Sequence, residues 1–366
     1  MLKQLTISNL RNITDISIRP ASGINLILGE NGSGKTSLLE AIHLLALGRS
    51  FRARSLKTAV QFGEQHLQVV ARTKNNVPVG LLFDLRDGLQ IRLNSAPLKK
   101  LSELAAQLPL QLVPANCHQF FEQGPRYRRQ LLDWGLFHVE PDFNYHWQSY
   151  RRVLQQRNSA LRQRKKHNEI QLWDNHLAHH GEEISNHRQR HLGNLLQQFK
   201  VIFPRLCPEF SDSAYALRYQ SGWLKDQSLK DSLQSTVERD AQLGYTRSGS
   251  HAADWTFRIN EIDPAAIFSR GQQKLFVLAL CIAQVTITLE NKHLNTDSSI
   301  ILIDDISSEL DLKHQSLVLT ELSKLPVQSF ITSTDFTLSK TLNDTENNSV
   351  FHVKQGLVSS NNDSLS

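Results

Sequence analysis

One stretch of the chain has residue types and spacing that suit phosphate binding. Residues 29–36 read Gly-Glu-Asn-Gly-Ser-Gly-Lys-Thr, which fits the pattern G-x-x-x-x-G-K-[ST]. Glycines let backbone N–H groups curl around phosphate oxygens without a Cβ clash. We expect Lys35 to reach the β- and γ-phosphates of ATP and Thr36 to hold Mg²⁺. The predicted nucleotide-binding residues of this loop are Gly29, Glu30, Asn31, Gly32, Ser33, Gly34, Lys35 and Thr36.

The segments on either side of this loop support the same interpretation. Residues 24–28 form a short apolar run that predicts a buried strand, and residues 37–42 open a helix. A helix N-terminus adds a positive dipole end next to the loop. A glycine-rich strand–helix turn without a ligand is the alternative, and the strand–loop–helix context favours the phosphate site over it.

A second set of candidate residues ends another apolar run. Residues 300–303 read Ile-Ile-Leu-Ile, which predicts a central parallel strand, and Asp304 and Asp305 follow. We expect Asp304 to bind Mg²⁺, mostly through water. We expect Asp305 to orient the attacking water as the catalytic base, with Lys35 as the catalytic cation. The alternative role for either acid is to cap a turn at the strand end.

A third motif lies ahead of this strand. Residues 269–273 read Ser-Arg-Gly-Gln-Gln at the start of an apolar helix, and Ser308–Asp311 follows the strand. This order resembles the ABC-type ATPase superfamily, in which the Ser-x-Gly motif of one subunit caps the γ-phosphate held by another. The resemblance implies nucleotide contacts from Ser269, Gly271 and Gln272. A plain capped helix is the alternative for these residues.

Further motifs narrow the resemblance to the group that contains RecF, SMC and Rad50. Residues 5–12 resemble the opening of that group, in which the arginine matching Arg11 lies near the nucleotide. Segments that resemble the RecF family span the chain, at residues 48–52, 124–129, 132–135, 156–158, 269–275, 303–305 and 308–311.

Membership of the RecF family implies an ATP-dependent DNA-binding protein of recombinational repair, replication restart and the SOS response to DNA damage. ATP and Mg²⁺ are the implied cofactors. Two copies join on single-stranded and duplex DNA at gap junctions, and slow DNA-dependent ATP hydrolysis acts as a switch. RecR and RecO are the implied partners that help to load RecA, in the cytoplasm and without a membrane.

The chain departs from the family pattern in two places. Gly249-Ser250-His251-Ala252 replaces a Gly-Pro-His-basic segment, so no charged contact is assigned to that loop. Ala115 stands where the family commonly has an acid, so no nucleotide-sensing role is assigned there. A switch histidine of the transporter type is also missing after the strand predicted at 329–333, where Thr332 and Thr334 stand.

The chain of 366 residues predicts about two domains. Residues 1–113 and 254–366 are expected to form an α/β ATPase lobe with a mixed sheet, of the ABC type. Residues 114–253 are expected to form an inserted, mostly helical lobe, with the motif at 269–273 near the junction. Long amphipathic helices are predicted between 147 and 203, interrupted at 179–181. The polar tail from Ser359 is expected to be disordered.

Composition agrees with a nucleic-acid partner and a reducing compartment. The net charge is +6 and the isoelectric point is about 9.2, which favours an acidic partner. Cys117, Cys207 and Cys281 are far apart and odd in number, without metal-ligand or redox spacing. No secretory segment opens the chain. The apolar run from 275 to 287 is too short to span a bilayer and predicts a buried core helix.

Basic residues gather in two clusters that could follow a phosphate backbone. The candidate DNA-binding residues are Arg126, Arg128, Arg129, Arg162, Arg164 and Lys165. Further basic residues of the second cluster are Arg151, Arg152, Arg157 and Lys166. For any one of them a solvated helix face is an equal alternative. Trp147 and Tyr150, which lie among these residues, are predicted to belong to the core.

Two other classes of protein remain as alternatives. One is the ATP-binding subunit of a membrane transporter, which the missing switch histidine and the basic charge balance disfavour. The other is a structural SMC- or Rad50-type head. Lys35 and Asp304 lie only 269 positions apart (304 − 35), which leaves too little chain for a long coiled-coil arm at about 1.5 Å per residue.

Overall fold

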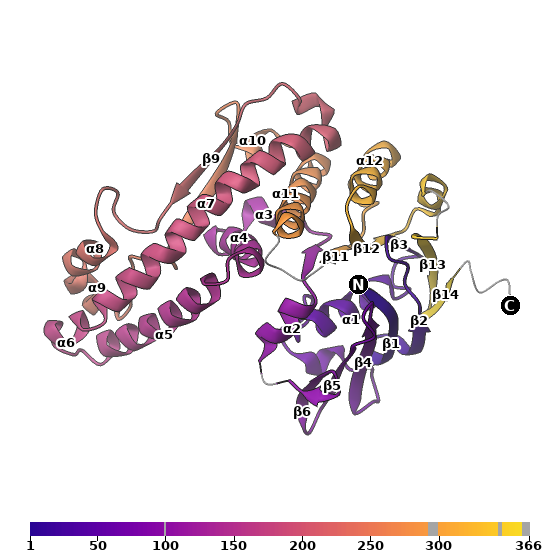
Figure 1. Ribbon diagram of the computed structural model, residues 1–366, viewed down its shortest axis with the longest axis horizontal. Coiled ribbons are helices and arrows are strands. Elements are labelled where there is room, and N and C mark those ends of the chain that lie inside the picture. Colours follow the sequence, from indigo (N-terminus) through magenta and orange to yellow (C-terminus); the bar gives the residue numbers. More distant parts are fainter. Residues whose placement is uncertain (99, 292–298, 343–345, 361–366) are drawn as a thin grey trace. The chain divides into compact units, whose positions relative to one another are not determined.

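The computed structural model describes residues 1–98, 100–291, 299–342 and 346–360, in two compact units (Figure 1). Unit 1 contains Met1–Cys117, Arg205–Pro208 and Arg270–Ser366. Unit 2 contains His118–Pro204 and Glu209–Ser269.

Unit 1 is built on two six-stranded sheets. The first has the order β2-β1-β4-β5-β6-β7 and is antiparallel throughout. Its strands are β1 (Leu2–Leu10), β2 (Ile13–Ile18), β4 (His66–Thr73), β5 (Pro78–Asp84), β6 (Gly88–Leu93) and β7 (Ala96–Pro97). Apolar side chains alternate with polar ones along β1 and β2, so one face of this sheet is buried and the other faces solvent.

The second sheet has the order β14-β13-β3-β12-β11-β8. Its strands are β3 (Ile24–Leu28), β8 (Leu110–Val113), β11 (Ser299–Ile303), β12 (Val327–Ser333), β13 (Ser349–Lys354) and β14 (Leu357–Ser360). All pairs are parallel except the hairpin β13–β14. Every residue of β3, β11 and β12 is buried, which the apolar runs at 24–28 and 300–303 predict for β3 and β11.

Helix α1 (Lys35–Leu47) contacts strands of both sheets, and its apolar side chains share one core with them. The other helices of unit 1 are α2 (Leu101–Gln107), α11 (Arg270–Glu290), α12 (Leu312–Ser323) and the short 3-10 helices η1 (Leu56–Ala59) and η3 (Phe336–Thr341). Because β3 enters α1 directly through the loop at 29–34, the core holds the glycine-rich loop between two rigid elements.

Helix α11 is the described helix that is long and apolar enough to cross a membrane by length and composition. The expectation that its apolar run is too short is therefore wrong, because the helix has 21 residues. Its apolar 18-residue window is nevertheless 78% buried inside the protein, and α11 packs beside β8. The predicted role of a buried core helix is confirmed.

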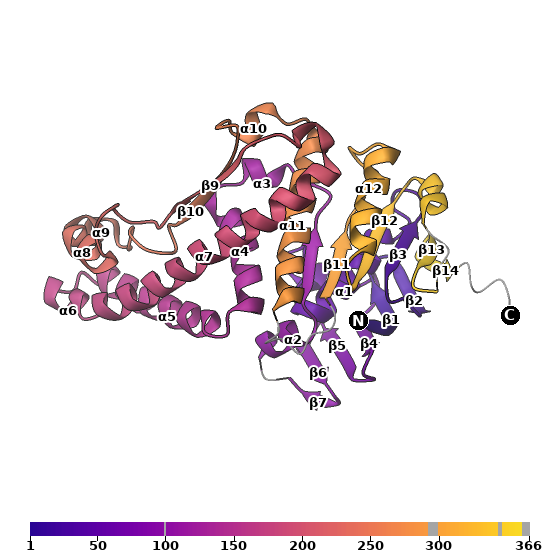
Figure 2. The ribbon, with the colours of Figure 1, turned by 45° about the horizontal axis from the view of Figure 1, so that its top comes forward.

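Unit 2 is mostly helical. Its helices include α3 (Gln119–Glu122), α4 (Pro125–Val139), α5 (Phe143–Arg162), α6 (His167–Gln171), α7 (Asp174–Leu206), α8 (Leu229–Ser235), α9 (Val237–Leu243) and α10 (Pro264–Ile267). A short 3-10 turn, η2 (Pro208–Phe210), follows α7, and β9 (Tyr215–Gln220) pairs antiparallel with β10 (Asp254–Ile259). Helices α5 and α7 run side by side in both views (Figures 1 and 2).

Helix α7 is continuous for 33 residues, so the predicted interruption at 179–181 is wrong. Gly181 serves packing there rather than a turn. A Cβ at this position would lie 2.5 Å from a methyl carbon of Leu229 and 3.0 Å from the ring of Tyr150. The missing side chain therefore lets α5 and α8 approach α7 closely.

Two predicted boundaries differ from the structure. Residues 254–269 belong to unit 2, since β10 pairs with β9 along its whole length, and the last stretch of unit 1 begins at Arg270 rather than at 254. The short stretch Arg205–Pro208, predicted for the helical lobe at 114–253, also belongs to unit 1. Ser359 and Ser360 belong to β14, so the predicted disordered tail does not begin at Ser359. Residues 361–366 of that tail lie outside the described residues.

Candidate nucleotide-binding site

The loop between β3 and α1 is closed around the side chain of Lys35. The ammonium of Lys35 donates hydrogen bonds to the carbonyl oxygens of Gly29, at 2.7 Å, and Glu30, at 2.8 Å. Burial lowers the pKa of Lys35, while the charges of Asp305 and Asp304 act to raise it. The structure thus holds a cation at the base of the loop, beside two carboxylates.

Glycine is required in this loop for two separate reasons. Gly32 and Gly34 have positive φ angles of 78° and 121°, which favour glycine. Gly29 is constrained by space, because a Cβ there would lie 2.4 Å from the carbonyl oxygen of Val353. The hydroxyl of Ser33 is buried and has no protein partner among the described residues. An orphaned buried hydroxyl inside a glycine cradle suits a polar ligand such as phosphate.

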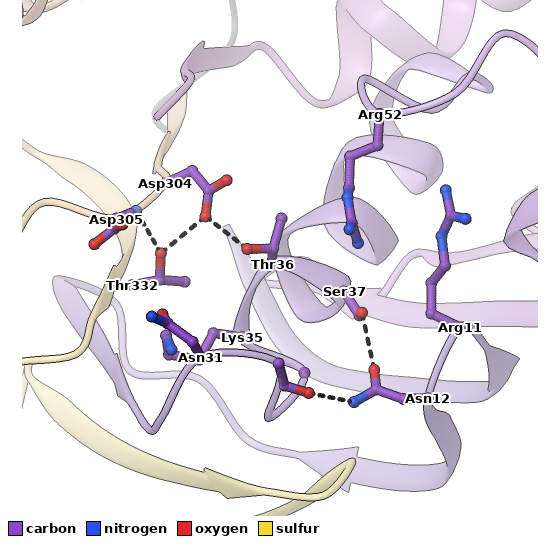
Figure 3. A pocket seen from close by; sticks show the side chains of 12 residues that line it. Arg11, Asn12, Asn31, Lys35, Thr36, Ser37, Arg52, Asp304, Asp305 and Thr332 are labelled. Carbon is purple, nitrogen blue, oxygen red and sulfur yellow. Dashed lines mark hydrogen bonds between the residues drawn. The ribbon is translucent and has the colours of Figure 1, made fainter. Parts of the chain in front are cut away.

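Oxygen ligands meet where β3, β11 and β12 end. The hydroxyl of Thr36 donates to Oδ1 of Asp304 at 2.9 Å, and the hydroxyl of Thr332 donates to the same oxygen at 3.0 Å (Figure 3). The backbone N–H of Asp305 donates to the Thr332 hydroxyl at 2.7 Å. A carboxylate and hydroxyls are hard oxygen ligands of the kind that Mg²⁺ takes, so the residues fit the implied metal.

Asp305 has an unusual backbone and a fixed side chain. Its φ is +50°, in the left-handed region that costs a residue with a Cβ energy. The hydroxyl of Ser307 donates to its Oδ1 at 3.0 Å. Buried Lys274 of α11 donates to the Asp305 carbonyl, to the Ser308 carbonyl at 2.8 Å and to the Ser308 hydroxyl at 3.0 Å. Lys274 thereby fixes the backbone that presents Asp305, a role that sequence reasoning missed.

Arg11 lies at the same pocket but is already paired. Its guanidinium donates two hydrogen bonds to the buried carboxylate of Glu40, at 3.0 and 2.9 Å, and a third to the Thr58 carbonyl. Arg52 approaches Glu40 at 3.5 Å. Two cations therefore share one buried acid, which leaves a net positive charge beside the loop.

These residues line one pocket of about 330 Å³ (Figure 3). Its lining residues are Arg11, Asn12, Asn31, Gly32, Gly34, Lys35, Thr36, Ser37, Arg52, Asp304, Asp305 and Thr332. Residues 12, 37, 52 and 332 had no predicted role. Asn12 connects two parts of the loop, because it donates to the Gly32 carbonyl at 3.2 Å and accepts from Ser37 at 3.0 Å. Asn12 and Arg52 both lie in segments that resemble the family, and this resemblance is the sequence feature that could have indicated a role at the pocket.

The predicted signature residues lie elsewhere. Ser269, Gly271 and Gln272 do not line this pocket. A Cβ at Gly271 would lie 2.6 Å from the Glu309 carbonyl oxygen, so the first turn of α11 approaches the segment after β11 closely. A contact of the signature with the nucleotide of a second copy stays a prediction.

Three predicted DNA-binding arginines differ in their surroundings. Arg128 donates two hydrogen bonds of 2.9 Å to the carboxylate of Asp254, and Arg129 donates to the Ala253 carbonyl. These bonds engage part of the donor set of each guanidinium within unit 2, and a DNA contact from either residue stays a prediction. Arg126 is exposed at the start of α4. Arg157 of the second cluster is also internal, fully buried between Asp174 and Asp240 at 2.9 and 2.8 Å.

The remaining cations of the second cluster face solvent. Arg162, Arg164 and Lys165 are exposed at the end of α5, and Lys165 lies 3.6 Å from Glu169. Arg162 also lines a groove of about 670 Å³ along α5, whose other lining residues are Trp147, Gln148, Arg151, Arg152, Leu154, Gln155 and Asn158. The Arg151 guanidinium lies 4.6 Å from the centre of the Trp147 ring. Trp147 is half-buried in this groove rather than in the core, whereas Tyr150 is buried as predicted.

Comparison with known proteins assigns the chain to a family. The sequence profile of the RecF/RecN/SMC N terminal domain family matches residues 1–359. A DNA replication and repair protein RecF from Nitrosococcus oceani is 40% identical over 362 residues, 98% of each chain. The RecF of Thioalkalivibrio sulfidiphilus is 37% identical over 363 residues, which cover 98% of this chain and 99% of that one. The chain belongs to the RecF family.

Solved structures give the same assignment. The recombination mediator protein RecF-ATP in the RecFOR pathway is 26% identical, with a TM-score of 0.81 over 98% of this chain and 97% of that one. An Smc head bound to the C-winged helix domain of ScpA covers 98% and 96% of the two chains at 15% identity, with a TM-score of 0.59. The predicted fold, an ABC-type ATPase head, is confirmed. These comparisons favour RecF over the transporter and SMC alternatives.

Proposed function

We propose that this RecF-family chain is an ATP-dependent DNA-binding protein of replication and repair. In this proposal, ATP binding joins two copies on DNA and hydrolysis separates them. One observation carries the proposal: Lys35, Thr36, Asp304 and Asp305 converge on one pocket at the ends of three parallel strands. That arrangement is needed to hold and cleave a nucleoside triphosphate.

Each residue has a role that follows from its position. The loop N–H groups and Lys35 bind the β- and γ-phosphates, because they form a fixed positive cradle. Thr36 and Asp304 hold Mg²⁺, which would neutralise phosphate charge. Arg11 and Arg52 add positive charge at the pocket wall, where Glu40 orients both guanidinium groups.

Hydrolysis requires a group that orients water, and Asp305 supplies it. Its carboxylate lines the pocket and is held by Ser307, while Thr332 and Lys274 fix its backbone. Asp304 is committed to hydroxyl partners, which leaves Asp305 as the acid available for the water. Asp305 acts as the base without a histidine after β12 to assist it, and we therefore expect ATP hydrolysis to be slow.

The proposed dimerisation depends on the signature motif at residues 269–273. Ser269, Gly271 and Gln272 bind the γ-phosphate held by a second copy, so both sites are complete only in the dimer. The RecF proteins of known structure are described as mediators in the RecFOR pathway, one of them with ATP. By that relationship we place the protein at DNA gaps in the cytoplasm, with RecR and RecO, where it assists RecA loading.

The proposal is tested by the mass of the protein in solution with ATP, with ADP and without nucleotide, each with and without DNA. ATP should produce the dimer and ADP should not. Lys35→Ala should weaken ATP binding by about 10- to 150-fold, which corresponds to one lost charged hydrogen bond, and abolish the dimer. Lys230→Ala, which removes an exposed lysine of unit 2, is the matched control. Unchanged ATP affinity in Lys35→Ala by calorimetry would contradict the assignment of the loop.

A further inference from the structure

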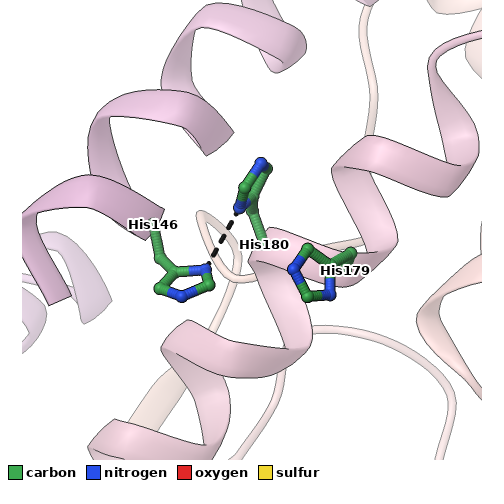
Figure 4. Close-up of side chains that lie close together, drawn as sticks. All are labelled: His146, His179 and His180. Atoms are coloured by element: carbon green, nitrogen blue, oxygen red, sulfur yellow. Dashed lines mark hydrogen bonds between the residues drawn. The ribbon is translucent and has the colours of Figure 1, made fainter. Parts of the chain in front are cut away.

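We infer that unit 2 carries a binding site for a transition-metal ion such as Zn²⁺, formed by His146 of α5 and by His179 and His180 of α7. One ring nitrogen from each histidine lies within 4.8 Å of the other two (Figure 4). The two helices that carry them are the longest in unit 2 and run side by side. The site shares no residue with the nucleotide pocket and does not depend on the proposed function.

The spacing of two of the rings already matches a metal site. Nδ1 of His146 lies 3.1 Å from Nδ1 of His180, so one of them donates a hydrogen bond to the other. In a tetrahedral zinc site with bonds of about 2.0–2.1 Å, ligand nitrogens lie about 3.3–3.4 Å apart. A metal ion can therefore replace the shared proton with little movement of either helix. His179 is exposed, and the centre of its ring lies 5.6 Å from that of His146 and 5.1 Å from that of His180.

Further histidines lie near the three rings, and the centre of the His187 ring is 6.3 Å from that of the His146 ring. Burial lowers the pKa of His146 and of His180, and the neighbouring histidines lower both further. His179 and His187 act on His146, whereas His146, His179 and His176 act on His180.

Nearby carboxylates complete the environment. The charges of Glu183 and Asp142 act in the opposite direction, raising the pKa of His146. Glu183 lies four positions after His179 and three after His180, on the same side of α7. It is placed to approach the fourth coordination position, or to balance the charge of the ion when water fills that position. Three imidazoles select Zn²⁺, Cu²⁺ or Ni²⁺ over Mg²⁺, which prefers oxygen.

Bound metal would connect α5 to α7. His146 is near the start of α5, and His179 and His180 lie in the second turn of α7. A cross-link between them stabilises the helical unit that also carries the exposed cations of α5. The inference therefore predicts a metal-dependent rise in the thermal midpoint of the full chain.

The experiment titrates the metal-free full chain with Co²⁺, in excess Mg²⁺, and follows the absorption bands of tetrahedral cobalt. We expect about one ion per chain, and about one Zn²⁺ after dialysis by elemental analysis. His179→Gln should weaken the affinity by at least about tenfold and remove the thermal shift. His167→Gln, at an exposed histidine of α6, should change neither.

A further variant distinguishes this site from the nucleotide pocket. Thr36→Ala removes a hydroxyl from the predicted Mg²⁺ ligands, and it should keep the Co²⁺ bands. Equal Co²⁺ affinity in His179→Gln and in the wild type would overturn the inference. So would loss of the bands in Thr36→Ala, or the absence of bound metal in the wild-type chain.

Discussion

At the residue scale, the two adjacent acids of the pocket, Asp304 and Asp305, have different hydrogen-bond partners. Asp304 accepts from Thr36 and Thr332 through one oxygen, which fixes the orientation of the carboxylate that we propose as a metal ligand. Asp305 has a left-handed backbone, and its carboxylate accepts a hydrogen bond from the Ser307 hydroxyl. The two adjacent carboxylates therefore have different surroundings, which is the basis for proposing different roles for them.

Asp305→Asn tests this division. The amide keeps an oxygen that can accept from Ser307 and keeps the Thr332 contact of the backbone, but it cannot take a proton. We expect ATP binding and dimerisation to persist while hydrolysis slows by about 10²- to 10⁴-fold, the usual contribution of a general base. Phosphate release measures the rate. Asp263→Asn, at the exposed N-cap of α10, is the control and should hydrolyse ATP normally. Unchanged turnover in Asp305→Asn would make this acid a structural cap.

At the element scale, unit 2 is held together by buried polar side chains. Arg157 of α5 pairs with Asp174 of α7 and Asp240 of α9, and it also donates to Thr246 at 2.7 Å. Breaking such a buried pair costs about 3–5 kcal/mol, since it leaves an unpaired charge. Arg157, which lies in the family-like segment 156–158, therefore stabilises the helical unit.

Buried histidines make this unit sensitive to acid. Burial lowers the pKa of His191 on α7 from 6.5 to about 4. Between these values the unfolded chain binds a proton that the folded chain does not, so stability is complete above pH 6.5 and falls as the pH falls toward 4. We expect His191 to contribute about 2 kcal/mol to the loss of unfolding free energy between about pH 7.5 and about pH 5. His191→Gln should flatten the dependence in denaturant titrations.

The control for this prediction is His167→Gln, which changes an exposed histidine of α6. It should keep the wild-type dependence of unfolding free energy on pH. If His191→Gln shows the same slope as the wild type and the control, His191 is not responsible for the acid sensitivity.

The exposed end of α5 is the element that we expect to follow the DNA backbone. Glutamate at Arg162, Arg164 and Lys165 should lower the dependence of DNA affinity on salt, because each lost phosphate contact removes about 0.9 from the logarithmic slope on duplex DNA. Titrations of fluorescent duplex DNA at several salt concentrations measure that slope. Wild-type affinity should not depend on sequence.

A variant with the same charge change provides the control. Glutamate at Lys225, Lys230 and Arg239 changes three exposed cations of unit 2 outside α5 and should leave the slope as in the wild type. If the α5 variant also keeps the wild-type slope, its three cations form a solvated face only.

Sequence reasoning was most successful where one short pattern decides the local structure. The loop at 29–36 and the apolar run before Asp304 predicted two buried strands and the helix after the loop, and the structure has β3, α1 and β11 there. It failed where the decisive partner lies far along the chain. The sequence around Arg128 does not show that its guanidinium binds the carboxylate of Asp254. The sequence around Gly181 does not show that Tyr150 and Leu229 pack against that position. The role of Lys274 was missed for the same reason. Its acceptors, the carbonyl oxygens of Asp305 and Ser308, lie 31 and 34 positions further along the chain.

At the scale of the whole molecule, the chain divides its proposed tasks between two units. Unit 1 contains the pocket, and unit 2 contains the exposed cations of α5 and the histidine cluster. The signature stands where the chain passes from one unit to the other, with Ser269 in unit 2 and Arg270 in unit 1. The central claim is that this segment acts on the nucleotide of a second copy.

Sedimentation of Ser269→Arg with saturating ATP tests this claim most directly. The P-loop of the same chain is unchanged, so the variant should bind ATP almost normally as a monomer. It should fail to dimerise, because a bulky cation replaces the hydroxyl meant for the partner's γ-phosphate. Ser235→Arg, with the same charge change at an exposed site of α8, should dimerise. If Ser269 is only a helix cap, the variant loses about 1 kcal/mol of stability and still dimerises. A dimer peak equal to that of the wild type would contradict the account.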